Sequence, residues 1–270
     1  MNIDPGTLAL ILLTGLGAGF AGGLLGIGGG IIIVPTLFSL APLFGWPAAS
    51  AMHLAVGTSL ATIIVTAAVS AAGHGRRGAI DHGLLKRWIP TLLLGVVLAS
   101  LAAGPLKSTV LSGLFSVIAF AVALNMARTA PLAVAAHLPA RWIQHGLALA
   151  IGLLSTLMGI GGGTLSVPVL TAYGMPIHRA VGSAAALGVA IAVVGAAGFV
   201  FAGLAAAQPL PPGALGFVYL PAALLIVPGA MLAAPWGVRL AHALDARRLR
   251  RVFALALMAI AGRMMWAALA

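Results

Sequence analysis

Long stretches without a charged side chain constrain this chain more than any other feature. No Asp, Glu, Lys or Arg lies between Asp4 and Arg76, Arg87 and Lys107, Lys107 and Arg128, Arg141 and Arg179, or Arg179 and Arg239. A helix that crosses a bilayer needs about 20 predominantly apolar residues, and each stretch is long enough. With 62% hydrophobic and 6% charged residues, a water-soluble fold could not cover the apolar surface. The sequence therefore predicts an all-α integral membrane protein that crosses the bilayer many times.

The net charge of +11 does not by itself indicate a nucleic-acid partner. The basic residues lie in short segments between apolar stretches, where they orient membrane helices and contact anionic lipid. We therefore expect the lipid bilayer as a partner and no nucleic acid. The chain has no Cys, which excludes disulfides and thiolate metal sites, and it has no obvious cluster of other metal ligands. We expect neither a metal nor a cofactor.

A glycine-rich motif occurs twice in the chain. Gly26–Gly30 reads Gly-Ile-Gly-Gly-Gly and is followed by Pro35, and Gly159–Gly163 has the same five residues and is followed by Pro168. Such an internal repeat at a long period indicates two related structural units.

Further similar segments follow each glycine motif. His53–Ser59 (HLAVGTS) is similar to His178–Ala184 (HRAVGSA), and Pro90 and Pro221 then open a third pair of apolar segments. We therefore predict two repeats. The first, 1–130, has a broken Gly-rich segment over 6–44 and helices over 48–73, 88–105 and 109–127. After a basic linker over 131–141, the second, 142–270, has a broken segment over 142–174 and helices over 180–204, 215–237 and 249–269.

The positions of Lys and Arg test how often each repeat crosses the membrane, because these residues prefer cytoplasmic loops. If each Gly-rich segment crosses once, the basic residues divide about equally between the two sides. If each segment returns to the side it came from and the N-terminus is outside, Lys107 is the one loop cation left outside. The second arrangement puts equivalent loops of the two repeats on opposite faces. It predicts inverted repeats, as in many secondary transporters.

The glycine motifs are the leading candidates for a binding site. Non-helical backbone at membrane depth must be buried in protein or line a wet cavity, because lipid cannot pair its N–H and C=O groups. Half-helices that begin near Ile31 and Thr164 would point N–H groups at an anion. The alternative is close helix packing, which the spacing of Gly15, Gly19 and Gly23 suits. We predict that the substrate is bound by Gly28, Gly29, Gly30, Gly161, Gly162 and Gly163, with Pro35 and Pro168 as structural breaks.

Polar side chains near the glycine motifs complete the candidate site: His53, Thr58, Ser59, His178, Arg179 and Ser183. The histidines either contact the anion or face lipid headgroups. The arginine either neutralises the substrate or anchors the orientation of the chain, and the hydroxyls either bind substrate or bond the preceding helical turn. The three carboxylates, Asp4, Asp81 and Asp245, fall in predicted loops or termini. Their absence from the predicted spans disfavours a cation transporter.

The duplicated motifs resemble those of the sulfite exporter TauE/SafE family. The similar segments are Gly26–Gly30 with Pro35, Ala55–Ser59, His74 followed by Gly78–Asp81, and the second copies Gly159–Pro168 and Ala180–Ser183. The resemblance covers essentially the whole chain. It implies a bacterial inner-membrane permease that moves a small oxyanion such as sulfite or a sulfonate.

The functional alternatives differ in what they require of the chain. We expect alternating access through a site between the two glycine motifs, no catalytic residues and no enzyme activity. An anion channel of the same fold remains an alternative. A membrane-embedded enzyme is disfavoured, because no nucleophile motif, paired carboxylates or metal-ligand cluster is evident. A homodimer is compatible with the sequence, which does not specify the oligomeric state.

Overall fold

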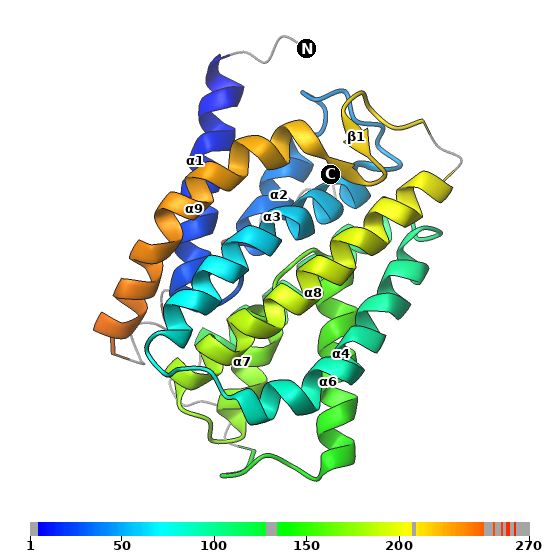
Figure 1. The fold of residues 1–270 in the computed structure, drawn as a ribbon. Helices are drawn as coiled ribbons and strands as arrows, with labels where there is room; N and C mark the ends of the chain where they lie inside the picture. The colour runs from blue at the N-terminus through cyan, green and yellow to red at the C-terminus, as the bar shows by residue number, and fades with distance from the viewer. Residues whose placement is uncertain are drawn as a thin grey trace.

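The computed structural model describes residues 5–127, 134–206 and 209–245, together with the single positions 251, 255, 258, 259 and 262. This part of the chain is almost entirely helical (Figure 1). The helices are α1 (Pro5–Leu25), α2 (Gly30–Leu40), α3 (Ala51–Gly75), α4 (His82–Ala103), α5 (Ser108–Ala127), α6 (Arg141–Met158), α7 (Gly163–Ala172), α8 (Ile177–Ala205) and α9 (Leu220–Ala243). The strands β1 (Ala214–Leu215) and β2 (Val218–Tyr219) form a short antiparallel hairpin before α9.

Six of the described helices are long and apolar enough to cross a membrane: α1, α3, α4, α5, α8 and α9. The chain is therefore an all-α, multi-pass membrane protein. The shorter apolar helices α2 and α7 have 11 and 10 residues, which corresponds to about 15 Å each, roughly half of the hydrocarbon core. The helix expected over 249–269 lies almost entirely outside the described residues.

Two helices begin at places that differ from the sequence expectation. Helix α4 begins at His82, before the expected residue 88, because the Asp81 side chain caps it by accepting a hydrogen bond from the Leu84 N–H at 2.9 Å. Helix α9 begins at Leu220, after the expected residue 215, because the β hairpin occupies the intervening residues.

These starting points also change which residues of α4 and α9 correspond to each other. Pro90 is the ninth residue of α4, and Pro228 holds the same place in α9. Pro221, which the sequence comparison paired with Pro90, lies in the first turn of α9, where a missing N–H costs little.

The residues over 6–44 and 142–174 each form two helices with a short non-helical connection, 26–29 in one case and 159–162 in the other. Pro35 and Pro168, expected at the breaks, instead lie inside α2 and α7, each at the sixth position of its helix. A proline there removes a bond only to a carbonyl in the first helical turn, so a short helix tolerates it. The helices are interrupted at the glycines.

The long helices pack in pairs. Helix α1 lies along α9, where Gly15, Gly19 and Gly23 face the α9 backbone so closely that none has room for a Cβ atom. Helix α4 lies along α6 in the same manner, through Gly95 and Gly152. Helices α3 and α8 cross the centre of the bundle and pack on each other (Figure 1). Close backbone approach at small residues is typical of helix association in membranes.

The helix ends gather at two ends of the bundle. We call one the basic end: it holds the ends of α1, α3 and α9 and the starts of α4, α6 and α8. The other, the aromatic end, holds the start of α9, the segment before α3 and the β hairpin, where Phe44, Trp46 and Tyr219 contact one another. Between Arg76 and Arg239, every described Lys and Arg except Lys107 belongs to the basic end, namely Arg76, Arg77, Lys86, Arg87, Arg141, Arg179 and Arg239.

Candidate functional site

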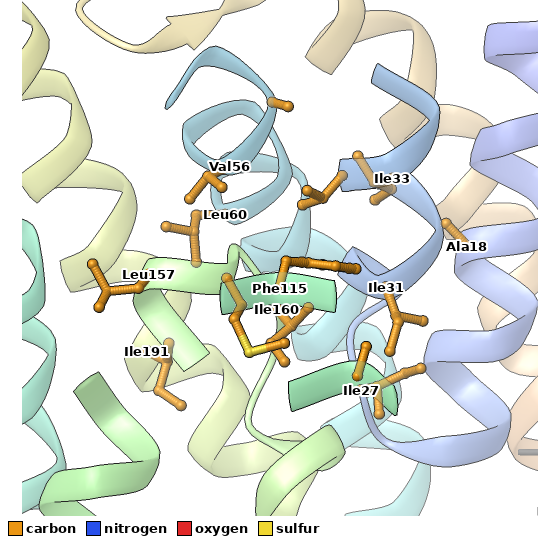
Figure 2. Close-up of a cluster of buried hydrophobic side chains, with 14 of the residues drawn as sticks. Ala18, Ile27, Ile31, Ile33, Val56, Leu60, Phe115, Leu157, Ile160 and Ile191 are labelled. Carbon is orange, nitrogen blue, oxygen red and sulfur yellow. The ribbon is translucent and has the colours of Figure 1, made fainter. Parts of the chain in front are cut away.

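The two glycine connections meet inside the bundle. The Gly161 N–H donates a hydrogen bond to the Ile27 carbonyl, with 3.2 Å between nitrogen and oxygen. Gly30 lies against the Gly159 carbonyl and Gly163 against the Gly26 carbonyl, and neither has room for a Cβ atom. Ile27 and Ile160 are both buried beside this contact, among core side chains from both halves (Figure 2). Residues far apart in the sequence thus form one buried backbone contact, which we call the glycine junction.

The two connections differ in backbone conformation. Gly28 and Gly29 are consecutive residues with φ angles of 67° and 84°, in the left-handed region where a side chain costs about 1–2 kcal/mol. In the second connection Gly159 has a φ of 64°, whereas Gly162 has an ordinary helical φ of −54°. The first connection therefore requires glycine more strictly than the second.

The glycine junction is also where α2 and α7 begin. Their N-cap residues are Gly29 and Gly162, and neither helix start is capped by a side chain. The first N–H groups of a helix have no partner within that helix, and the helix dipole places partial positive charge on them. Both starts are buried. Two buried, uncapped helix starts can favour an anion between them.

Three buried hydroxyls in the second Gly-rich segment have no hydrogen-bond partner among the described residues: those of Ser155, Thr164 and Ser166. A buried donor without a partner is costly, so such groups are expected to bind a ligand or water. Thr164 is the second residue of α7, next to the junction. Sequence reasoning missed these residues because hydroxyls in membrane helices usually bond the preceding turn, as Thr156 and Thr171 do here.

The structure separates the three hydroxyls that the sequence did single out. The Ser59 Oγ–H donates to the Gly159 carbonyl at 2.7 Å and so contacts the glycine junction. The Thr58 hydroxyl accepts from the Tyr219 N–H at 2.8 Å, at the start of α9. The Ser183 hydroxyl accepts from the Asp81 N–H at 2.9 Å, at the start of α4. Thr58 and Ser183 therefore hold helix starts at the two ends of the bundle.

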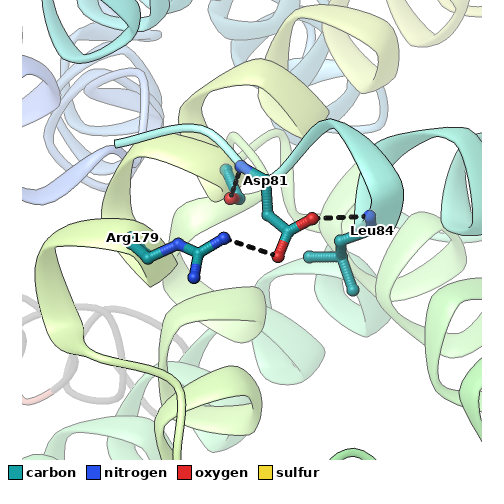
Figure 3. A network of polar contacts seen from close by, with 4 residues as sticks. Asp81, Leu84 and Arg179 are labelled. Atoms are coloured by element: carbon teal, nitrogen blue, oxygen red, sulfur yellow. Dashed lines mark hydrogen bonds and ion pairs between the residues drawn. The ribbon is translucent and has the colours of Figure 1, made fainter. Parts of the chain in front are cut away.

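The predicted histidines and the arginine also lie toward the ends of the bundle. His53 is at the aromatic end, with its Nε2 atom 3.0 Å from the Ala103 carbonyl. At the basic end, the His178 ring stacks on that of His242, and the Arg179 guanidinium pairs with the Asp81 carboxylate at 3.0 Å (Figure 3). The side chain of Arg179 is 52% exposed. The sequence placed these residues near the glycine motifs, but α3 and α8 begin at the bundle ends.

The residues of the glycine junction are buried. A cavity of about 730 Å³ lies between α4 and α8. Its lining, which includes Val97, Leu101, Val194 and Phe201, is mostly apolar and suits a lipid chain better than an anion. Binding at the junction therefore requires a change of conformation.

Comparison with known proteins decides the family. Residues 11–264 match the model of the sulfite exporter TauE/SafE family. The chain belongs to this family. A probable membrane transporter protein of Haemophilus influenzae is 34% identical over 258 residues, which cover 94% of this chain and 96% of the relative. A probable membrane transporter protein of Methanocaldococcus jannaschii is 26% identical over 251 residues, 90% of each chain. The names of the family and of these relatives indicate a membrane transporter and not an enzyme. No solved structure matches the chain.

Proposed function

We propose that this TauE/SafE protein is a bacterial inner-membrane permease that moves a small oxyanion, such as sulfite, a sulfonate or a related organosulfur anion. The observation that carries the proposal is the glycine junction, where two uncapped helix starts and the unpaired Thr164 hydroxyl are buried together. These groups are hydrogen-bond donors without a formal charge, and such a set binds a weakly basic oxyanion and releases it again. The contacting residues we propose are those of the two connections, with Ser59, Thr164 and, from the same segment, Ser155 and Ser166.

Matching contacts support an inverted repeat as the architecture. The first long helix of each half packs along the third long helix of the other half, α1 on α9 and α6 on α4. A hydroxyl on the second long helix of each half accepts a bond at the start of the third long helix of the other half. Thr58 of α3 accepts from the Tyr219 N–H before α9, and Ser183 of α8 accepts from the Asp81 N–H before α4. One of these bonds is at the aromatic end and the other at the basic end. Such an exchange is expected for two halves related by an axis in the membrane plane.

The distribution of charge supports an orientation. Because the described Lys and Arg between Arg76 and Arg239 gather at the basic end with one exception, we assign that end to the cytoplasm and the N-terminus to the outside. The chain has no Cys, so a single cysteine at Ile80 reports its side cleanly. We expect an impermeant thiol reagent to label it from the cytoplasmic side alone. Labelling from the outside of intact cells would reverse this orientation.

The burial of the glycine junction supports alternating access as the mechanism. The contacts at each end include a backbone-to-hydroxyl bond between the two halves, with the aromatic cluster beside it at one end and the Asp81–Arg179 pair at the other. A carrier opens these ends in turn. The glycines of both connections are buried, which favours a carrier over a channel.

The test is transport by the purified protein in proteoliposomes. Radiolabelled sulfite, sulfoacetate, methanesulfonate and chloride should be offered separately, with empty liposomes as the control. We expect saturable uptake of at least one sulfur oxyanion and little chloride uptake. Single-channel currents in planar bilayers would instead establish a channel. No flux of any sulfur oxyanion by folded protein would refute the proposed substrate class.

A further inference from the structure

A chain of three imidazole rings lies at the basic end. His74 of α3 is fully buried, and its Nδ1 atom is 3.0 Å from the Nε2 atom of His242 on α9. The His178 ring from α8 stacks on His242, with 5.3 Å between ring centroids and 17° between planes. His178 and His242 are half-buried. The three rings therefore lead from a partly exposed position to a buried one.

The hydrogen-bond partners define where the protons lie in this chain. The Nε2 atom of His74 is 3.0 Å from the Gly23 carbonyl oxygen, which can only accept, so this nitrogen carries a hydrogen. In the neutral pair, His74 Nδ1 then accepts from the Nε2–H of His242. One added proton binds His242 Nδ1 and leaves the bond between the rings intact. A second added proton binds His74 Nδ1, so that both facing nitrogens carry a hydrogen and the bond between the rings is lost.

His74 belongs to a joint between α3 and the α1–α9 pair. Ser70 donates to the Gly22 carbonyl of α1 at 3.1 Å, and Arg77, just beyond α3, donates to the Val238 carbonyl of α9 at 3.0 Å. Ser70, His74 and Arg77 are spaced by four and three positions and so share one helical face. His74 alone bonds both members of the pair, and of these three side chains only its imidazole can gain a proton.

We propose that the His74–His242 pair is a proton-binding site, and that proton uptake there loosens the joint between α3 and the α1–α9 pair and so favours opening of the basic end. As a coupling mechanism this rests on the proposed transport function. An ionisable group buried within a membrane bundle is costly unless it serves a function, which supports the assignment.

The charges that face the pair set the direction of its response. The end of α3 contributes Arg76 and Arg77, and α8 contributes His178 and Arg179. Helix α9 contributes Arg239 and, just beyond its end, the carboxylate of Asp245; the α1 residues Pro5–Leu25 include no ionisable side chain. The one carboxylate beside α8, Asp81, is paired with Arg179. This cationic surrounding opposes protonation while the joint is closed, and opening to water relieves the repulsion. Acid pH therefore favours the open joint.

A groove at the basic end reaches the edge of the joint at Arg77 and Val238. This groove of about 360 Å³ lies between α3 and α9 and is lined by Arg76, Arg77 and Arg239, with Gly73 and Val238 at its sides. At the aromatic end, His53 bonds the Ala103 carbonyl and contacts the Phe217 ring, so no second imidazole faces it among the described contacts. A pH difference across the membrane therefore acts chiefly on one end.

The test uses a cysteine in the joint and needs no substrate. In purified protein in nanodiscs, Ser70→Cys places a thiol inside the joint, and Ala140→Cys gives an exposed reference at the basic end. The maleimide labelling rate at Ser70→Cys is divided by that at Ala140→Cys, which largely cancels the pH dependence of the thiol. We expect this ratio to rise several-fold between about pH 8 and about pH 5.5, with a ceiling of about tenfold per pH unit for each proton bound.

Two backgrounds make the labelling result specific. His242→Gln cannot titrate and should flatten the ratio, whereas His145→Gln, which removes a histidine outside the chain of rings, should leave the rise unchanged. A flat ratio in the protein with all native histidines would overturn the proposal. This outcome does not depend on whether His242→Gln folds. An equal rise in the folded His242→Gln background would overturn it as well.

A flux measurement separates this proposal from the transport function. Methanesulfonate does not buffer in this pH range, so its uptake into proteoliposomes is measured with and without an imposed pH difference. We expect the pH difference to change uptake by the native protein and to have little effect in His242→Gln. An unchanged response in His242→Gln would refute the proton site alone. Absence of flux in all variants, with the labelling rise intact, would refute this substrate and leave the proton site standing.

Discussion

Helices α3 and α8 follow similar paths through the centre of the bundle but join their neighbours by different means. When α3 and α8 are aligned by the similar motifs at their starts, five polar residues of α3 correspond to five apolar residues or glycines of α8. The α3 residues are Ser59, Thr62, Thr66, Ser70 and His74, and their counterparts are Ala184, Leu187, Ile191, Gly195 and Phe199. Four of the α3 side chains donate to backbone carbonyls of the Gly-rich segments. Helices α3 and α8 thus begin with similar motifs but pack through different chemistry.

This difference indicates which contacts are fixed and which can slide. Hydrogen bonds are directional, and each contributes about 0.5–1.5 kcal/mol. Three of these α3 side chains, Thr66, Ser70 and His74, hold the end of α1 and the first connection in one register, whereas the second connection receives one such bond, from Ser59. Thr66 donates to the Gly28 carbonyl at 2.6 Å, whereas the second connection packs on α8 through Gly162 and Gly188. Apolar contacts between small residues lack that directionality. We therefore expect the first connection to tolerate change less well than the second.

The largest expected effect comes from a methyl group added to the first connection. Gly29 has a φ of 84°, and a Cβ atom there would collide with the Ala18 backbone. At Gly162 the φ is ordinary and the nearest backbone oxygen, that of Ala184, would lie 3.1 Å from the Cβ atom. We expect Gly29→Ala to lower anion flux more than about tenfold, which 1–2 kcal/mol of left-handed strain plus the collision would produce. Gly162→Ala should cost clearly less.

The control for this pair is Gly17→Ala, because a Cβ atom at Gly17 would meet nothing within 4 Å. All three variants are compared in proteoliposomes at equal amounts of folded protein. Flux near the native value for Gly29→Ala would remove the first connection from the transport site. Equal losses for Gly29→Ala and Gly162→Ala would remove the distinction between the two connections.

The fold class could be predicted from the sequence because transfer of apolar side chains into a bilayer is a local property. Runs without charge indicate helices long enough to span, and six such helices are described. The start of α9 could not be predicted, because apolar strand residues such as Val218 read like helix residues in a hydrophobic run. The pairing of Pro90 with Pro221 instead of Pro228 followed from that error.

The candidate site was predictable only in part. The glycine motifs indicated a special backbone, and positive φ angles occur there. Which hydroxyl stays unpaired depends on tertiary contacts: Ser59 finds the Gly159 carbonyl, whereas Thr164 finds no partner among the described residues. The sequence could not distinguish them, since both are small polar residues in apolar helices. The contact between His74 and His242 joins helices far apart in the chain and leaves no local pattern.

An intermediate effect is expected from removal of one α3 hydroxyl. Thr66→Val preserves shape but removes the donor to the Gly28 carbonyl, and the loss of a partner by a buried polar group costs about 1–3 kcal/mol. We expect a lower thermal unfolding midpoint in detergent and reduced flux. Thr62→Val is the matched control, because the Thr62 hydroxyl bonds the Ser59 carbonyl of its own helix. Equal stability of the two variants would show that α3 does not hold the first connection by hydrogen bonding.

The smallest effect is expected at Arg179, on the start of α8. Its partner Asp81 is 27% exposed and also caps α4, so the two residues have separable roles. An exposed ion pair contributes about 0–1 kcal/mol, whereas loss of an N-cap costs about 1 kcal/mol. We therefore expect Arg179→Ala to change stability and anion affinity little, and Asp81→Ala to destabilise the protein more. Asp81→Asn keeps a capping oxygen without the charge and should resemble Arg179→Ala, as measured by thermal unfolding and by saturation of anion uptake. A large loss of affinity in Arg179→Ala, with normal stability, would place this arginine on the substrate path and make the start of α8 as specific in its chemistry as α3.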